Sequence, residues 1–167
     1  LHRQQAAHDT GNVFPTLVSE FDDNDTAAMR LSVERFTATH GRKPKITFAC
    51  AGNTCRSALS EHLVRKSLGD DAIDVNSVGV RLSSGGGHID GGDGDRSGGE
   101  PMSSYAAVYL CGRYRCEDAS HHHISQAITR ANTQDSDMVI FMTAKLMQEA
   151  ALKLGYDDGR PPFNWVT

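Results

Sequence analysis

Residues 45–68 contain the feature that most constrains the fold. Residues 46–49 read Ile-Thr-Phe-Ala, a short apolar and partly β-branched run that predicts a buried strand over 45–50. Residues 57–68 then follow a helical pattern, with Leu59, Leu63 and Val64 on one side and Gly69 available to end the helix. Cys50 is therefore expected where the strand ends and the loop to the helix begins.

The same alternation continues along the chain. Strands are predicted over 73–80, 137–142 and 163–166, and helices over 25–40, 101–116 and 144–154. In the helix over 101–116, Tyr105, Val108, Tyr109 and Gly112 are expected to lie against the sheet. Residues 83–99 are dominated by Gly, Asp and Ser, which predicts a mobile surface loop. The alternation predicts an α/β fold, with a parallel sheet, helices on both faces and right-handed crossovers.

Size and composition favour one domain and exclude several classes of function. With 167 residues, 38% of them hydrophobic, one compact domain can bury a core without disulfides or metals. A formal charge of -4 and the absence of a basic run argue against nucleic acid. No stretch approaches the roughly 18 apolar residues of a membrane helix, so neither a membrane partner nor a signal is expected, and the location expected is cytoplasmic. The four cysteines are then expected to be free thiols.

The loop after the first strand is predicted to bind an oxyanion. Its backbone amides, residues 51–56, can curl around an anion at the positive end of the following helix, at the sheet edge where α/β proteins place ligands. Gly52 permits a positive φ angle, and Asn53 can brace the loop with its amide. Arg56 adds a planar fork that can hold two oxygens of a phosphate.

Cys50 is the predicted nucleophile of this loop. The field that attracts an anion also favours a thiolate, and Ser57 can donate its hydroxyl to the sulfur. The alternative is an inert buried Cys50 at a strand end and an Arg56 that is only a surface charge. Strand, glycine, asparagine, arginine, serine and helix nevertheless occur in the order that a catalytic loop requires, which favours the nucleophile.

Three segments, of which the first contains this loop, connect the chain to a known family. Residues 46–61 read Ile-Thr-Phe-Ala-Cys-Ala-Gly-Asn-Thr-Cys-Arg-Ser-Ala-Leu-Ser-Glu and resemble the signature of the low-molecular-weight protein tyrosine phosphatases. Residues 77–79, Ser-Val-Gly, resemble the Ser-Ala-Gly after that family's second strand, and residues 121–128 resemble its histidine-rich turn before the strand over 137–142. The resemblance covers 45–167, which predicts a phosphatase-like domain there and leaves 1–44 as a helical or partly disordered extension.

The resemblance implies a fold, a reaction and site residues. The fold would be a three-layer, Rossmann-like one with a four-stranded parallel sheet. The reaction would be hydrolysis of a phosphotyrosine protein or a small aryl phosphate through a cysteinyl-phosphate intermediate, with phosphate or sulfate also able to occupy the loop. Cys50 would be the nucleophile, Arg56 the transition-state clamp and Cys55 a redox partner of Cys50. The implied phosphate-binding loop comprises Ala51, Gly52, Asn53, Thr54, Cys55, Arg56 and Ser57.

The chain departs from the family at three positions. Ser57 is followed by Ala58 where the family usually has proline, and Thr143 replaces an acidic residue after the third strand. The family's general acid belongs to an Asp-Pro pair after the fourth strand, whereas the sequence given reaches Thr167 before such a pair. Asp157 and Asp158 are interpreted as turn residues, so the general acid is unknown.

Two functions other than ester hydrolysis are compatible with a loop of this kind. A thiol-dependent arsenate reductase shares the loop but needs two relay cysteines after the third strand, whereas Cys111 and Cys116 precede it. A phosphoryl-binding module without turnover is the other alternative. Three successive histidines over 121–123 point in different directions, so a polar turn is favoured over a zinc site, and no metal or cofactor is expected.

Overall fold

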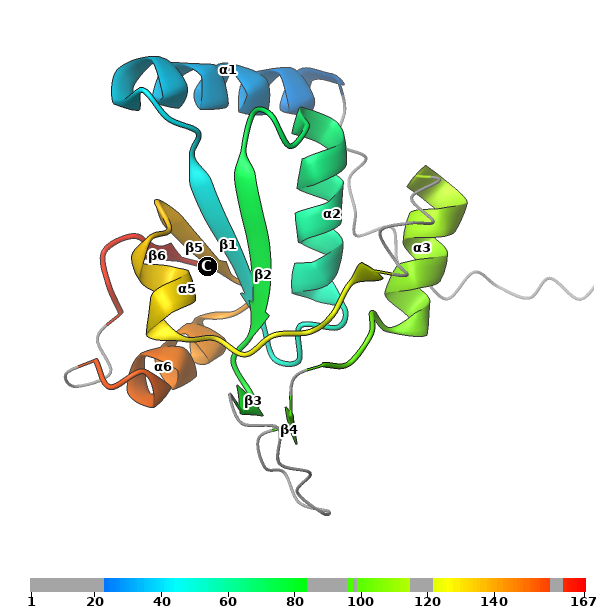
Figure 1. Cartoon of the computed structure of the whole chain (residues 1–167), viewed down its shortest axis with the longest axis vertical. Helices are drawn as coiled ribbons and strands as arrows, with labels where there is room; N and C mark the ends of the chain where they lie inside the picture. The colour runs from blue at the N-terminus through cyan, green and yellow to red at the C-terminus, as the bar shows by residue number, and fades with distance from the viewer. Residues whose placement is uncertain (1–22, 84–95, 98, 115–121, 157–160) are drawn as a thin grey trace, which may run out of the picture.

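The structure is a computed structural model of the chain that describes residues 23–83, 96–97, 99–114, 122–156 and 161–167. Helices and strands alternate through most of it (Figure 1). The helices are α1 (Asp23–His40), α2 (Arg56–Leu68), α3 (Ser104–Tyr114), α5 (Arg130–Gln134) and α6 (Ala144–Lys153). The strands are β1 (Lys45–Cys50), β2 (Asp74–Gly79), β3 (Leu82–Ser83), β4 (Arg96–Ser97), β5 (Met138–Phe141) and β6 (Trp165–Val166).

The main sheet has four parallel strands in the order β2-β1-β5-β6. In the register of the central pairs, Cys50 lies opposite Gly79 and Ala49 opposite Phe141. Parallel strands bring their carboxyl ends to one edge, so the segments after β1, β2 and β5 leave the sheet together. The predicted α/β fold with a four-stranded parallel sheet is confirmed.

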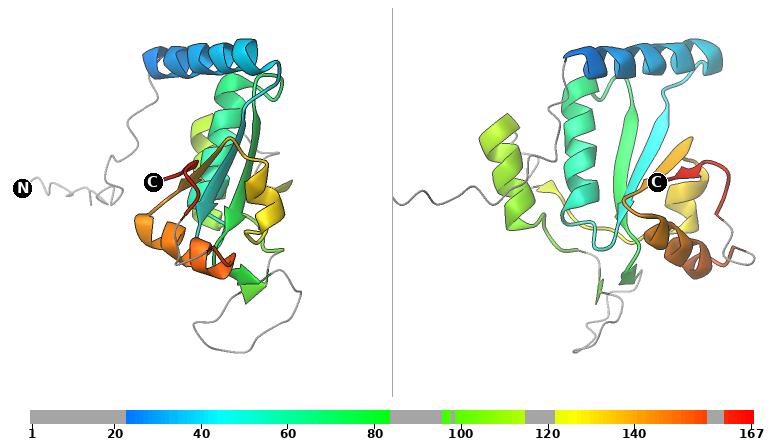
Figure 2. Two further views of the ribbon diagram at one scale, coloured as in Figure 1. Left: turned by 90° about the vertical axis from the view of Figure 1, so that its left-hand side faces the viewer. Right: turned by 180° about the vertical axis from the view of Figure 1, so that it is seen from behind.

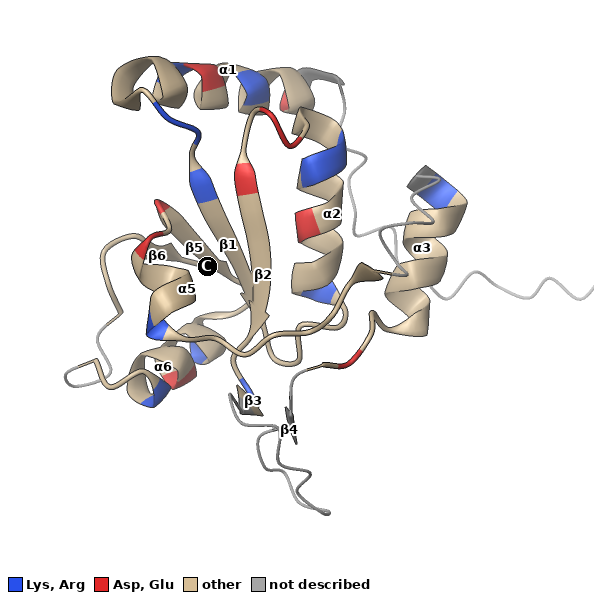
Figure 3. Ribbon diagram, in the orientation of Figure 1, with Lys and Arg blue, Asp and Glu red and all other residues tan. Residues whose placement is uncertain are grey.

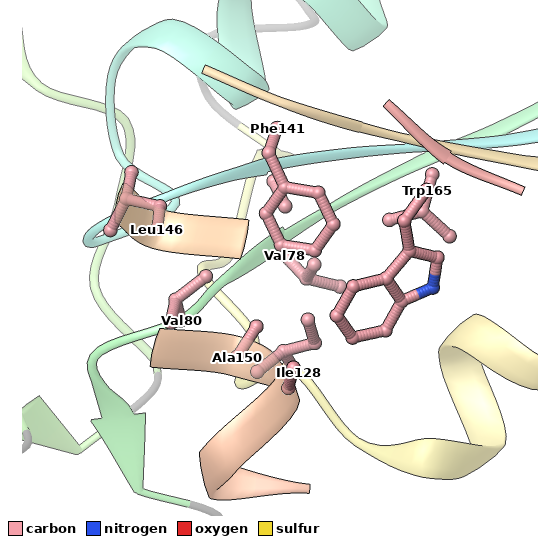
Figure 4. Close-up of a cluster of buried hydrophobic side chains, with 10 residues drawn as sticks. Val78, Val80, Ile128, Phe141, Leu146, Ala150 and Trp165 are labelled. Carbon is pink, nitrogen blue, oxygen red and sulfur yellow. The ribbon is translucent and has the colours of Figure 1, made fainter. Parts of the chain in front are cut away.

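One face of the sheet packs against α6 and the segment before α5. A continuous apolar cluster fills this layer (Figure 4) and includes residues from β1, β2, β5 and β6. Its buried members are Ala49, Val78, Val80, Ile128, Val139, Phe141, Leu146, Ala150, Ala151 and Trp165. Thr47 on the same face is fully buried and hydrogen-bonds Ser136 beside α5 at 2.7 Å. This packing fixes the position of the carboxyl edge of the sheet.

The other face packs against α2, and α3 packs on α2. The contact between the two helices is formed by Ala58, Leu63, Met102, Ala106 and Leu110. Tyr105 and Val108, expected against the sheet, are instead 78% and 71% exposed. The prediction was wrong because α3 buries Ala106 and Leu110, four residues apart on one face, together with Met102 just before the helix.

Helix α1 lies across the end of the sheet opposite α6 (Figure 2). It is joined to the domain by a hydrogen bond from Arg30 to the Ser67 carbonyl oxygen and by the segment that follows it, where Arg42 forms a bidentate ion pair with Asp137. This hydrogen bond from Arg42 is the main reason why the pKa of Asp137 is lowered. The division of the chain at residue 44 stays a prediction, and residues 1–22 lie outside the described residues.

Several element boundaries differ from the predictions. α3 begins at Ser104 rather than at Pro101, which forms an isolated bridge with Ile124 instead. Helix α5 was not predicted, because five residues are too few for a periodic pattern; Thr129 and Asn132 form its capping box. Phe163 precedes β6 and is fully exposed. Of the predicted surface loop over 83–99, two residues form β4 and most lie outside the described residues.

No described helix is long and apolar enough to cross a membrane.

Candidate active site

The loop between β1 and α2 lies at the carboxyl edge of the sheet, as predicted (Figure 1). Cys50 is the last residue of β1 and is 3% exposed. The left-handed backbone conformation of the loop lies at Asn53, whose φ angle is 51°, and not at Gly52. Asparagine is among the few residues with a side chain that tolerate this conformation. The turn of the loop therefore depends on Asn53.

Two groups donate hydrogen bonds to the sulfur of Cys50. The Ser57 hydroxyl lies 3.0 Å from Sγ, and the backbone N–H of Asn53 lies 3.2 Å from it. Ser57 is fully buried in the first turn of α2, so the sulfur also lies at the positive end of that helix. Both donors point at the sulfur, where they can stabilise negative charge during a reaction.

The fully buried side chain of Asn53 links the loop to two distant segments. Its Nδ2 donates to the hydroxyls of Ser57, at 3.1 Å, and Ser77, at 2.7 Å. Its Oδ1 accepts from the backbone N–H of Gln126 at 2.8 Å. Ser77 donates in turn to a carboxylate oxygen of Glu61 in α2. Asn53 thus braces the loop, as predicted, through partners that lie 24 and 73 residues farther along the chain.

His123 supports the same residue from its other side. The buried imidazole donates from Nε2 to the carbonyl oxygen of Asn53 at 2.6 Å. His123 also makes an edge contact with the ring of His62, whose centroid is 5.6 Å away. Burial is the main reason why the pKa of His62 is lowered. The predicted polar turn therefore includes a histidine that supports the loop.

Arg56 and Cys55 differ from their neighbours because both are exposed. The guanidinium of Arg56 has no hydrogen-bond or ion-pair partner among the described residues, so it is available to a ligand. Cys50 and Cys55 are both free thiols. Thr54 anchors the next turn of the loop, because its carbonyl oxygen accepts from the N–H of Ser103 at 2.6 Å.

The segment after β2 continues the hydrogen bonding of the sheet along the start of the loop. The N–H of Val80 donates to the Cys50 carbonyl oxygen at 2.8 Å, and that of Arg81 to the Ala51 carbonyl oxygen at 2.9 Å. Gly79 passes so close that a Cβ atom there would lie 3.1 Å from the carbonyl carbon of Gly52. The loop therefore rests directly on the backbone of residues 79–81.

Several other predicted candidates are not placed by the structure. Asp157, Asp158, Cys116 and His121 lie outside the described residues. Within the described ranges, no group of three or more His, Cys, Asp or Glu side chains is placed to hold a metal ion.

Comparison with known proteins supports the resemblance to a phosphatase family. Residues 45–93 match the family model for low molecular weight phosphotyrosine protein phosphatase. The chain resembles that family. A low molecular weight protein-tyrosine-phosphatase, PtpB of Staphylococcus haemolyticus, is 53% identical to it over 36 residues, which make up 22% of this chain and 25% of that relative. The matched segment thus spans a quarter of the relative's length.

Solved structures support the fold over a longer part of the chain. The low molecular weight protein tyrosine phosphatase SP-PTP of Streptococcus pyogenes gives a TM-score of 0.53 at 17% identity, over 74% of this chain and 70% of that protein. YfkJ of Bacillus subtilis gives a TM-score of 0.52 at 23% identity, over 75% of this chain and 70% of that protein. At these identities the likeness concerns the fold.

The residues that sequence reasoning missed are those that reach the loop from elsewhere. Ser77 was noticed only as part of a motif, and His123 only as part of a histidine run. A serine and a glycine at the end of the second predicted strand could have indicated a close approach to the first strand's loop, because parallel strands end at the same edge. The role of Gln126 has no such sequence signal, since it acts through its backbone N–H.

Proposed function

We propose that the protein hydrolyses phosphate monoesters with Cys50 as the nucleophile, with phosphotyrosine proteins or small aryl phosphates as substrates. The observation that carries this proposal is the sulfur of Cys50, which accepts hydrogen bonds from Ser57 and from the Asn53 N–H at the start of α2. An inert structural thiol has no need of two donors. The unpartnered guanidinium of Arg56 begins the same helix and supplies a binding group for phosphate.

In the proposed reaction the thiolate attacks phosphorus, an S–P bond forms and the bond from phosphorus to the aryl oxygen breaks. Arg56 and the amides of Ala51, Gly52, Asn53, Thr54 and Cys55 would hold the phosphoryl oxygens as charge develops on them. A water molecule then cleaves the S–P bond and releases phosphate. Ser57 stabilises the sulfur as it leaves, because its hydrogen bond to Sγ favours the thiolate.

Asn53, Ser77 and His123 would act by keeping this loop rigid. A phosphate cradle needs its amides oriented before the substrate arrives, since reorientation during the reaction costs free energy. Asn53 is held at its side chain and at its carbonyl oxygen, so its backbone is constrained on both sides.

The cytoplasmic location expected from the sequence stays a prediction.

The test is hydrolysis of p-nitrophenyl phosphate and of a phosphotyrosine peptide by the wild-type chain and by Cys50→Ser. We expect turnover by the wild type, loss of turnover in the variant, and phosphate binding by both, because an alcohol is a far weaker nucleophile than a thiolate. Cys55→Ser is the matched control, since Cys55 occupies the same loop without the donors that reach Cys50.

The outcomes separate the alternatives. Turnover that persists in pure Cys50→Ser would remove Cys50 from the mechanism. Phosphate binding without turnover in the wild type would indicate a phosphoryl-binding module. Reduction of arsenate in the presence of a thiol donor, with no ester hydrolysis, would favour the reductase.

A further inference from the structure

Lys153 at the end of α6 interacts with the segment that supports the phosphate loop. Its Nζ donates to the carbonyl oxygen of Val80 at 2.8 Å and to that of Leu82 at 2.6 Å. One turn earlier in the helix, Glu149 forms a bidentate ion pair with Arg81, both distances being 2.9 Å. This hydrogen bond with Arg81 is the main reason why the pKa of Glu149 is lowered. Figure 3 shows acidic and basic residues in α6 and a basic residue in the chain that leads into β3.

A continuous line of hydrogen bonds connects Lys153 to the loop. The Val80 carbonyl belongs to the peptide group whose N–H is that of Arg81, and this N–H donates to the Ala51 carbonyl oxygen. The Ala51 carbonyl belongs to the peptide group whose N–H is that of Gly52, one of the amides expected to hold phosphate. Two peptide groups therefore separate the ammonium of Lys153 from a donor of the anion site.

Charge at one end of such a line affects the donor at the other end. An ammonium that donates to a carbonyl polarises the peptide group and strengthens its N–H as a donor, and hydrogen bonds in a chain reinforce one another. The positive charge of Lys153 also adds directly to the field that favours an anion in the loop. Both effects have the same sign, so they add.

We propose that Lys153 is a positioning residue of the phosphate-binding loop, which strengthens the Gly52 amide as a donor to phosphate through the peptide groups 80–81 and 51–52. The inference rests on the proposed function, because it takes the loop to be a phosphate site. Lys153 lies outside the loop and 103 positions beyond Cys50 in the sequence, so no motif of the loop includes it.

The test compares Lys153→Met with Lys145→Met. Lys145 lies in the first turn of the same helix and is exposed, so its substitution removes the same charge without removing a hydrogen bond to residues 80–82. Inorganic phosphate is titrated into each protein by calorimetry, and the pH dependence of Cys50 alkylation by iodoacetamide is recorded. Thermal unfolding of both variants shows whether the fold is kept.

For Lys153→Met we expect phosphate affinity to fall about five- to tenfold, because part of a charged hydrogen bond's contribution is transmitted to the anion. The midpoint of the alkylation curve should move to higher pH, since the thiolate loses positive field. Lys145→Met should lower the affinity less than about twofold and leave the alkylation midpoint in place, because Lys145 donates no hydrogen bond to residues 80–82 and its exposed charge is screened. Lys153→Arg, which keeps charge and donors, should restore most of the affinity.

Equal effects of the Lys145 and Lys153 substitutions would overturn the inference, because net charge alone would then explain the change. A lower unfolding temperature in Lys153→Met with unchanged affinity and alkylation would overturn it as well. If that variant does not fold, Lys153→Gln, which keeps a donor and removes the charge, is measured in the same way. If the wild type neither binds nor hydrolyses phosphate esters, the proposed function fails, and the alkylation curves alone decide the role of Lys153.

Discussion

Substitution of Asn53 would show how strongly the loop depends on one buried side chain. Asn53→Gly removes three hydrogen bonds, to Ser57, to Ser77 and from the Gln126 amide, while keeping a backbone that readily adopts a φ angle of 51°. At a net value of about 1 kcal/mol for each buried hydrogen bond, the free energy of unfolding should fall by about 3 kcal/mol. Asn53→Ala should lose about 1 kcal/mol more, because alanine disfavours left-handed geometry.

The assay is urea unfolding followed by fluorescence of Trp165, the single tryptophan and a buried one. The rate of Cys50 alkylation is measured in parallel, and it should change in both Asn53 variants because the loop loses its brace. Asn132→Ala is the matched control. Its side chain accepts a hydrogen bond from the Thr129 N–H and donates one to the Ala127 carbonyl oxygen, but at the start of α5 rather than in the loop.

We expect Asn132→Ala to lower stability without changing the alkylation of Cys50. The reasoning would be refuted if Asn53→Ala were as stable as Asn53→Gly, since the positive φ angle would then carry no cost. It would also be refuted if neither Asn53 variant lost more than about 1 kcal/mol, because three buried hydrogen bonds would then contribute less than one is expected to.

Four other predictions follow from the same geometry. Gly79→Ala should weaken phosphate binding in calorimetry, because its Cβ would lie 3.1 Å from the backbone of Gly52; unchanged affinity would contradict this. The free energy of unfolding of the wild type should fall as the pH drops below about 6.5. Below this pH His62 takes up a proton in the unfolded chain, whereas its lowered pKa in the folded protein opposes protonation. Urea unfolding at pH 7.5 and 5.5 should show a smaller fall in His62→Gln, and an equal fall would exclude His62. Mild peroxide should link Cys50 to Cys55 reversibly, which mass spectrometry would detect; finding sulfonic acid alone would count against it. If no general acid protonates the leaving group, nitrophenyl phosphate should be hydrolysed about 10² to 10⁴ times faster than phosphotyrosine peptide, whereas equal rates would show that such an acid is present.

The local part of the fold and of the site could be read from the sequence. β1, the loop and α2 follow one another within 24 residues, and the strand pattern, Gly69 and the apolar side of the helix indicate each boundary. Cys50, Asn53 and Ser57 fall inside the same segment, so their proximity follows from chain geometry alone. The periodic segments that became α1, β5 and α6 were placed within two residues of their observed bounds for the same reason.

The face that α3 buries could not be decided in this way. Tyr105 and Val108 are larger and more apolar than Ala106, which made them the expected core residues. The structure buries Ala106 instead, because α3 packs closely on Ala58 of α2 and small side chains permit that approach. Hydrophobicity ranks residues one at a time, whereas packing depends on the shape of the neighbouring helix.

The loop of residues 51–56 and its place between a strand and a helix could be read from the sequence alone, because both depend on contacts between residues a few positions apart. Only the tertiary structure decided what keeps that loop in shape. Ser77, Gln126, His123 and Lys153 come from four segments, and parallel strands bring those segments to one edge of the sheet. Their partners are backbone atoms and buried amides, which every sequence contains in abundance, so nothing in the sequence marks the few that meet.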